Sequence, residues 1–193
     1  MKTKTENTYI NQSTQFAGLK QRLKAFLYDY IFVAAYILLL VVVGGSVYRV
    51  FGPLDEISPM FTTAFSRDAM AFLILIFPVM LYFAYRESAP STKSWGKYKA
   101  GIQVVKVNGN KITFWQALLR SFVKFLPWQI AHTCIFQIQV VEPRSTAYQM
   151  TLVGFGLVYL LVGIYLVSAI VSKQNRTPYD FISGTYVIVK EES

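Results

Sequence analysis

Cysteine and histidine are almost absent from this chain of 193 residues, which has one of each, Cys134 and His132. A single cysteine excludes an intramolecular disulfide, and the pair is too few for a Cys/His metal cluster. Charge is also sparse, since Asp, Glu, Lys and Arg make up 15% of the residues while apolar residues make up 54%. We therefore expect no disulfide, no bound metal and no other cofactor, and a protein of the lipid bilayer.

The sequence also lacks the common catalytic motifs. It has no glycine-rich phosphate loop ending in Lys-Ser/Thr, no His-Glu metal helix and no nucleophile elbow. We predict that the chain is not an enzyme.

Long apolar runs are abundant. Runs of 19, 17 and 28 residues without a charged side chain occupy 30–48, 69–85 and 145–172. At about 1.5 Å per helical residue, each approaches or exceeds the roughly 30 Å of a hydrocarbon core. These runs predict membrane spans over about 27–48, 68–85 and 147–171.

A further span over about 118–141 is more ambiguous. Arg120 and Lys124 lie in its first turns, Pro127 predicts a kink, and only 17 uncharged residues separate Lys124 from Glu142. One interpretation is a polar, kinked crossing whose cations reach back to the membrane surface, and the other is an interfacial helix that does not cross. We favour the crossing, because an interfacial helix would place the basic C-terminal tail outside the cell.

The distribution of basic residues supports four crossings. With a cytoplasmic N-terminus, the inside regions collect 16 of the 19 Lys and Arg residues, as the positive-inside rule requires. The formal net charge of +9 then needs no nucleic acid partner, although Lys93, Lys97 and Lys99 are placed to attract anionic lipid head groups. We expect a flexible cytoplasmic tail over 1–18 and one membrane domain over 19–193, with both termini cytoplasmic.

Short β-branched runs outside the spans predict a small sheet. Asn108 and Gly109 form the preferred pair for a two-residue hairpin turn between strands over 102–107 and 110–114. A third strand is predicted over 185–190, which four crossings would place on the same side. The expected fold is therefore an all-α transmembrane helix bundle of four crossings with a small cytoplasmic hairpin or three-stranded cap.

Arg22 and Asp29 raise a question about charge at the membrane border. Seven helical residues leave their side chains about 20° apart around the axis and roughly 10 Å apart along it. Because helical side chains lean toward the N-terminus, Arg22 points away from Asp29. We predict that each has another counter-charge: Asp180 for Arg22, and Arg120 or Lys124 for Asp29.

Three stretches of sequence together carry a family resemblance. They are "RLKAFLYDY" at 22–30, "SWGKYKAGIQVVKVNGNKITFWQALLRSFVKFLPWQIAH" at 94–132 and "RTPYDFISGTYVIV" at 176–189. In order and spacing they resemble the RDD family of small bacterial membrane proteins, which is named for one arginine and two aspartates.

Individual residues match the family pattern. The positions in register are Arg22, Asp29, Asp180 with Gly184 and Thr185, the Gly96-Lys97 pair, Gly101 and Arg120. The chain departs from the pattern in small ways only, with Ser94 where many members have threonine and Ser183 where many have alanine.

The resemblance implies a multi-pass protein of the bacterial cytoplasmic (inner) membrane, with a role in transport. We expect a small secondary transporter for monovalent cation/proton antiport or for a small solute, using Asp29 and Asp180, with His132 as a possible proton relay. A homo-oligomer is expected, since four helices alone make a narrow bundle. The alternative is a non-transporting scaffold or accessory module in which Arg22, Asp29, Asp180 and Arg120 form a structural ion-pair clasp.

Overall fold

The computed structural model describes residues 14–53, 62–88 and 93–190. The described chain is mostly helical and has a small two-stranded sheet. By its contacts the chain divides into two compact units. Unit 1 comprises Met1–Tyr30, Met80–Lys124 and Ile164–Ser193, and unit 2 comprises Ile31–Val79 and Phe125–Gly163.

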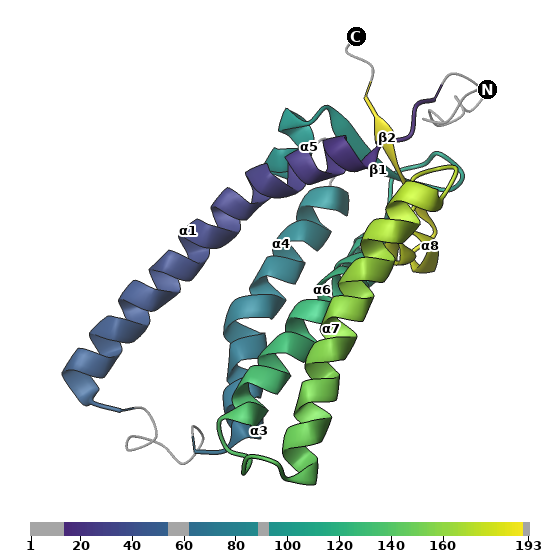
Figure 1. Ribbon diagram of the computed structural model, residues 1–193. Helices are drawn as coiled ribbons and strands as arrows, with labels where there is room; N and C mark the ends of the chain where they lie inside the picture. Colours follow the sequence, from purple (N-terminus) through teal and green to yellow (C-terminus); the bar gives the residue numbers. More distant parts are fainter. Residues whose placement is uncertain (1–13, 54–61, 89–92, 191–193) are drawn as a thin grey trace. The chain divides into compact units, whose positions relative to one another are not determined.

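The elements follow one another in this order: α1 (Leu19–Phe51), α3 (Ala64–Ala71), the π-helix η2 (Phe72–Ile76), α4 (Phe77–Ser88), α5 (Trp95–Lys99), β1 (Ile102–Lys106), α6 (Phe114–Ile138), α7 (Thr146–Val171), α8 (Pro178–Ile182) and β2 (Thr185–Val189). Three of the predicted spans lie within long helical stretches, and the predicted span over 118–141 extends three residues beyond the end of α6. Each long helical stretch has residues in both units, whereas the strands and the short helices α5 and α8 lie within unit 1. Figure 1 labels these elements.

Three of the described helices are long and apolar enough to cross a bilayer: α1, the continuous helix over Ala64–Ser88, and α7. Helix α7 is apolar on all sides, and large side chains such as Val153 and Leu160 are more than half exposed. A helix that is apolar all round requires an apolar environment. The structure therefore agrees with a membrane protein.

Helix α6 differs from these three. It has 25 residues and continues through Pro127, so it is long enough to span a bilayer. It is not among the helices that are apolar enough to cross a membrane, because it contains Arg120, Lys124 and several uncharged polar residues. Whether α6 crosses the membrane stays a prediction.

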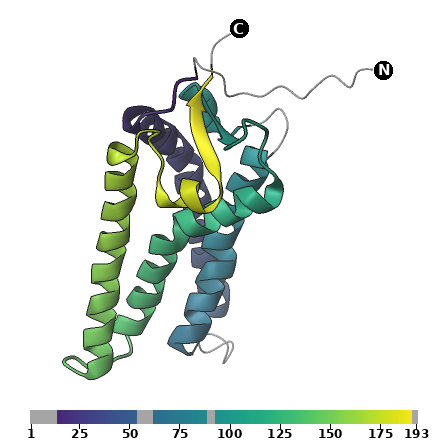
Figure 2. The ribbon, with the colours of Figure 1, turned by 90° about the vertical axis from the view of Figure 1, so that its right-hand side faces the viewer.

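The sheet consists of β1 and β2, which pair antiparallel from Ile102 opposite Val189 to Lys106 opposite Thr185 (Figure 2). Two of the three predicted strands are therefore present. The predicted strand over 110–114 is wrong, since residues 111–113 are irregular and α6 begins at Phe114.

A helix cap explains the missing strand. The Thr113 N–H and hydroxyl lie 3.4 and 3.2 Å from Gln116 Oε1, and the Gln116 N–H lies 3.4 Å from Thr113 Oγ1. This reciprocal pattern is a capping box, which starts a helix. The chain still turns at Gly109, whose φ is 81°. After the turn, one backbone hydrogen bond joins the two arms, from Lys106 N–H to Asn110 C=O, and the predicted hairpin goes no further.

The other edge of β2 is occupied by the end of the predicted tail. Ala17 N–H donates to Val187 C=O at 2.8 Å, and Val189 N–H donates to Gln15 C=O at 2.9 Å. Residues 1–13 of the predicted tail lie outside the described residues. The last part of the tail was predicted to be flexible, but its residues 15–17 are hydrogen-bonded to the edge of the sheet.

The two strands are introduced in the same way. Ser94 and Thr177 precede five-residue helices α5 and α8, and Gly101 and Gly184 follow them with φ of 65° and 61°. Glycine adopts this left-handed conformation without a Cβ penalty. As a result, each short helix leads directly into its strand.

The core of unit 1 is small and aliphatic. Its buried residues come from α1, α4, α6 and both strands, and from the segments just before α1 and α6: Ala17, Ala25, Ala84, Ile102, Val104, Ile112, Ala117 and Val187. Small alanines allow the helices to approach closely, which brings polar side chains at their edges together.

Unit 2 contains the π-helix. Pro78 has no N–H, so it cannot donate to the carbonyl of Ile74, and Phe77 N–H bonds to Phe72 C=O five residues back. The Tyr36 hydroxyl instead donates to the Ile74 carbonyl. In the same unit, Asp68 accepts hydrogen bonds from Gln129 and Thr133.

Candidate functional site

Asp180 is the centre of a buried ion-pair network in unit 1. Arg120 Nη2 and Nε donate to its Oδ1 at 2.7 and 3.1 Å, and Arg22 Nη1 donates to its Oδ2 at 2.7 Å. Thr177 adds its backbone N–H and hydroxyl to Oδ2 at 3.0 and 2.8 Å. Asp180 is completely buried, so these five donors replace its water shell.

The pKa of Asp180 reflects these contacts. Burial alone would raise the pKa of a carboxyl group, but Arg120, Arg22 and the Thr177 N–H favour the ionised form and lower this pKa to about 2. Asp180 is therefore a permanent anion at physiological pH. Asp180 also stabilises the start of α8, because it lies in the first turn of that helix, three residues after the N-cap residue Thr177.

Glu87, at the end of α4, is a second acidic centre. Its Oε2 accepts from Arg120 Nη1 at 2.7 Å, and its Oε1 accepts from Lys97 Nζ at 2.5 Å. Arg120 thereby joins Glu87 to Asp180. We call the connected residues Arg22, Glu87, Lys97, Arg120 and Asp180 the charge clasp.

Asp29 has different partners. Its Oδ2 accepts from the Ser94 hydroxyl and its Oδ1 from the Gly96 N–H, both at 2.7 Å. This contact depends on glycine, since a Cβ on residue 96 would lie 1.9 Å from the Ala25 carbonyl oxygen and 2.7 Å from Asp29 Cγ. The start of α5 therefore lies directly against α1, and buried Asp29 connects the two helices.

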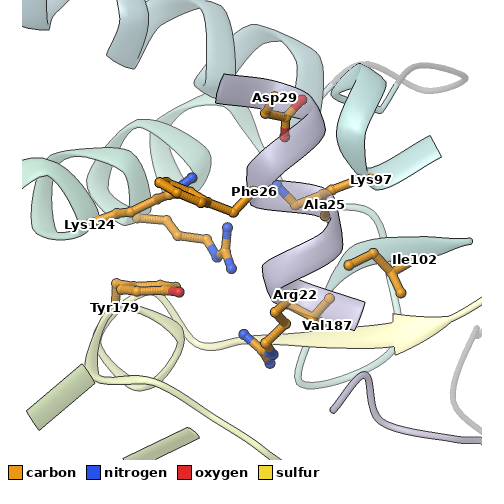
Figure 3. A pocket seen from close by; sticks show the side chains of 10 residues that line it. Arg22, Ala25, Phe26, Asp29, Lys97, Ile102, Lys124, Tyr179 and Val187 are labelled. Carbon is orange, nitrogen blue, oxygen red and sulfur yellow. The ribbon is translucent and has the colours of Figure 1, made fainter. Parts of the chain in front are cut away.

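A cavity of about 80 Å³ lies between these elements. It is lined by residues from the first turns of α1, from α5, β1, α6, α8 and β2: Arg22, Ala25, Phe26, Asp29, Lys97, Ile102, Arg120, Lys124, Tyr179 and Val187. Figure 3 shows Phe26, Lys124 and Tyr179 beside the first turns of α1, with Asp29 and Arg22 at different levels of that helix.

Lys124 contributes both charge and packing to this cavity. Its ammonium lies 4.1 Å from the centre of the Phe83 ring, a cation–π distance. Asp29 and Lys124 line the same cavity without belonging to the charge clasp. The clasp and the cavity thus share Arg22, Lys97 and Arg120 as a common wall.

The predicted counter-charges can now be compared with the structure. The Arg22 and Asp180 pair is confirmed. The prediction that Arg120 pairs with Asp29 is wrong, because Arg120 bonds to Asp180 and Glu87 and Asp29 is held by hydroxyl and backbone donors. Lys124 lines the same cavity as Asp29, and its pairing with Asp29 stays a prediction.

His132 belongs to unit 2 and is not among the residues that line the cavity. Its ring Nδ1 lies 2.9 Å from the Trp128 carbonyl oxygen, one turn earlier in α6. The relay therefore stays a prediction that gains no support from these contacts.

Sequence reasoning missed Glu87, Ser94 and the acidic role of the α4 end. Glu87 follows Arg86 at the boundary of an apolar run, where a charge ordinarily marks the water interface. The sequence held no signal for this role, because the burial of Lys97, which requires an acidic partner, is known only from the fold. Ser94 was recognised only as a small departure from a family pattern.

Comparison with known proteins agrees with this arrangement. The RDD family matches residues 16–184, which contain every member of the charge clasp and every lining residue of the cavity except Val187. No curated protein and no solved structure matches the chain. With its arginine at position 22 and its aspartates at positions 29 and 180, this chain belongs to the RDD family.

Proposed function

We propose that the chain is a small secondary transporter of the bacterial cytoplasmic membrane that moves a small ion together with, or in exchange for, protons. The observation that supports this proposal is the cavity beside Asp29. It is lined by five charged side chains from two long helices and one short helix. Ionisable groups at membrane depth are costly and usually mark an ion or proton path.

Within the proposal, the charge clasp and the cavity have separate tasks. Asp180 has five donors on its two oxygens, so a transported cation would have to displace two arginines to reach it. Asp29 accepts one hydroxyl and one backbone donor and faces the cavity. We therefore assign the transport role to Asp29 and a structural role to Asp180.

The proposed topology has four crossings, with α6 as the third, and both termini in the cytoplasm. Two observations support it. The basic residues concentrate in the regions that this topology places inside, and the N-terminal residues Gln15 and Ala17 bond to β2 near the C-terminus. These described residues near the two ends of the chain therefore lie together, as the proposed topology requires. A homo-oligomer remains part of the proposal by analogy with other small transporters.

The charge clasp itself favours a second candidate function. Four buried ion pairs at 2.5–2.7 Å also suit a non-transporting scaffold, in which they fix the sheet and short helices against the membrane helices. In that case Asp29 would be a helix-to-helix connector, and no ion would move.

Proteoliposomes separate the two functions. Purified protein is reconstituted with a pH-sensitive dye inside the vesicles, and sodium, potassium, lithium, chloride or nitrate gradients are applied. The proposal predicts a pH change above that of empty vesicles for at least one ion. Absence of any ion-dependent proton movement in folded, oriented protein would leave the scaffold function.

Asp29→Asn is the informative variant, because asparagine keeps the size and the acceptor oxygen but cannot carry the charge. Transport predicts folded protein with lost flux. The scaffold predicts poorly folded Asp29→Asn protein and no flux in either the variant or the wild type. Asp68→Asn is a matched control: Asp68 is also a hydrogen-bonded aspartate at a helix, but it belongs to unit 2.

A further inference from the structure

We infer that the cavity beside Asp29 binds a small monovalent anion. Four of its lining side chains are cationic, namely Arg22, Lys97, Arg120 and Lys124, and Asp29 is the one carboxylate among the ten lining residues. The resemblance to the RDD family led us to expect a cation, so this inference concerns a different class of ligand.

The charge balance around the cavity supports an anion. Glu87 and Asp180 stand behind the lining and pair with three of its cations. Together with Asp29, they provide three acidic side chains against four basic ones. The basic groups are in excess, so the electrostatic environment favours an anionic ligand over a cationic one.

The available hydrogen-bond donors support the same conclusion. Among the described residues, Arg22 Nη2 is buried and has no hydrogen-bond partner, and the Arg22 side chain is only 10% exposed. Lys124 brings a further ammonium to the cavity wall. An anion accepts bonds from such groups, whereas a metal cation would be repelled by them.

The carboxylates offer little to a cation by comparison. Both oxygens of Asp29 accept short hydrogen bonds from Ser94 and Gly96, and those of Asp180 and Glu87 accept from arginine and lysine. A sodium or potassium ion needs several oxygen ligands. It could reach them only by displacing donors that already neutralise these acids.

The size of the cavity limits the ligand. A space of about 80 Å³ holds several water molecules, since one needs roughly 10–15 Å³ on this measure. Chloride, nitrate and formate fit this size and carry one charge. Ring walls from Phe26 and Tyr179 leave little room for a phosphodiester with its glycerol, so we commit to a free anion and not to a lipid head group.

Binding is tested with purified protein in neutral detergent, which separates it from transport. Unfolding temperature is followed by tryptophan fluorescence while sodium gluconate is replaced by sodium chloride, nitrate or formate at constant ionic strength. We expect a saturable rise with at least one small anion. In Lys124→Gln the half-saturating concentration should increase about tenfold or more, because a charge-assisted contact is lost.

Lys111→Gln is the matched control, since Lys111 is exposed and outside the cavity; its anion response should equal that of the wild type. Lys124→Arg, which keeps the charge, should retain the response. The inference is overturned if the wild type responds to sodium, potassium or lithium but to no anion, if Lys124→Gln responds like the wild type, or if only anionic lipid has an effect. Anion binding without flux would contradict the transport proposal and leave this inference standing.

Discussion

Arg120→Met tests the charge clasp most sharply, because one side chain joins two acids. Arg120 is 3% exposed and donates through Nη1 to Glu87 and through Nε and Nη2 to Asp180. Methionine keeps much of the length and apolar contact of arginine. The substitution therefore removes mainly the charge and its hydrogen bonds.

The expected loss follows from what each acid retains. Removing one partner of a buried ion pair costs about 3–5 kcal/mol when the other charge is left alone. Here Asp180 keeps Arg22 and Thr177, and Glu87 keeps Lys97. We therefore expect the lower end, a loss of about 3 kcal/mol in the free energy of unfolding.

The assay is equilibrium unfolding in mixed micelles with increasing SDS, followed by tryptophan fluorescence. Arg49→Met is the matched control, since Arg49 is exposed at the end of α1; it should change the free energy by less than about 0.5 kcal/mol. A double-mutant cycle with Glu87→Gln should give a coupling energy of at least about 1 kcal/mol. Equal effects of the two Met variants, or additive effects in the cycle, would refute the clasp.

Three further predictions concern single contacts. Asp180→Asn should lose a contribution of about 2.5 kcal/mol at pH 7, and its difference from the wild type should fall by about half at pH 3: a carboxyl whose pKa is lowered stabilises the fold above its unfolded pKa near 4 and loses this effect toward pH 2. Unfolding at several pH values checks this, and a pH-independent difference would contradict it. Gly96→Ala should destabilise by 3 kcal/mol or more, on the order of the largest overpacking costs, because its Cβ meets backbone at 1.9 Å; Gly44→Ala, with open space around it, should be neutral or stabilising in the same assay. Tyr36→Phe should cost about 1 kcal/mol by leaving the Ile74 carbonyl without its hydroxyl donor, and no change would mean that the hydroxyl contact is not maintained in lipid.

The parts of the fold that depend on local pattern were predictable from sequence. The apolar runs predicted the three membrane-type helices, because an uncharged run of this length has few alternatives. The β-branched stretches after Gly101 and Gly184 predicted β1 and β2. The pair between Arg22 and Asp180 also followed, since a helix-border charge needs a counter-charge and few acids were available.

Other features depend on contacts between segments that are distant in the sequence. The strand over 110–114 failed because "TFWQ" at 113–116 is a helix-start signal that competes with the preceding turn. The partners of Asp29 are a hydroxyl and a backbone N–H, and no charge pattern reveals a backbone donor. Only the close packing of Gly96 on α1 brings it there.

One sequence signal was present and becomes clear with the fold. Ser94, Lys97 and Gly101 have the same order and the same spacing, three and then four residues, as Thr177, Asp180 and Gly184. In both segments a hydroxyl residue precedes a short helix, a buried charge lies three residues later, and glycine leads into a strand. The repeated pattern therefore delivers one buried cation and one buried anion to the charge clasp.

The central claim is that the cavity moves a small ion with protons while the charge clasp only holds it in shape. The most direct test compares proton flux in proteoliposomes for equal amounts of wild type, Asp29→Asn and Lys124→Gln. Both variants alter cavity residues outside the charge clasp. The account predicts ion-dependent flux in the wild type and its loss in both folded variants; wild-type flux no greater than that of empty vesicles, or unchanged flux in both variants, would contradict it.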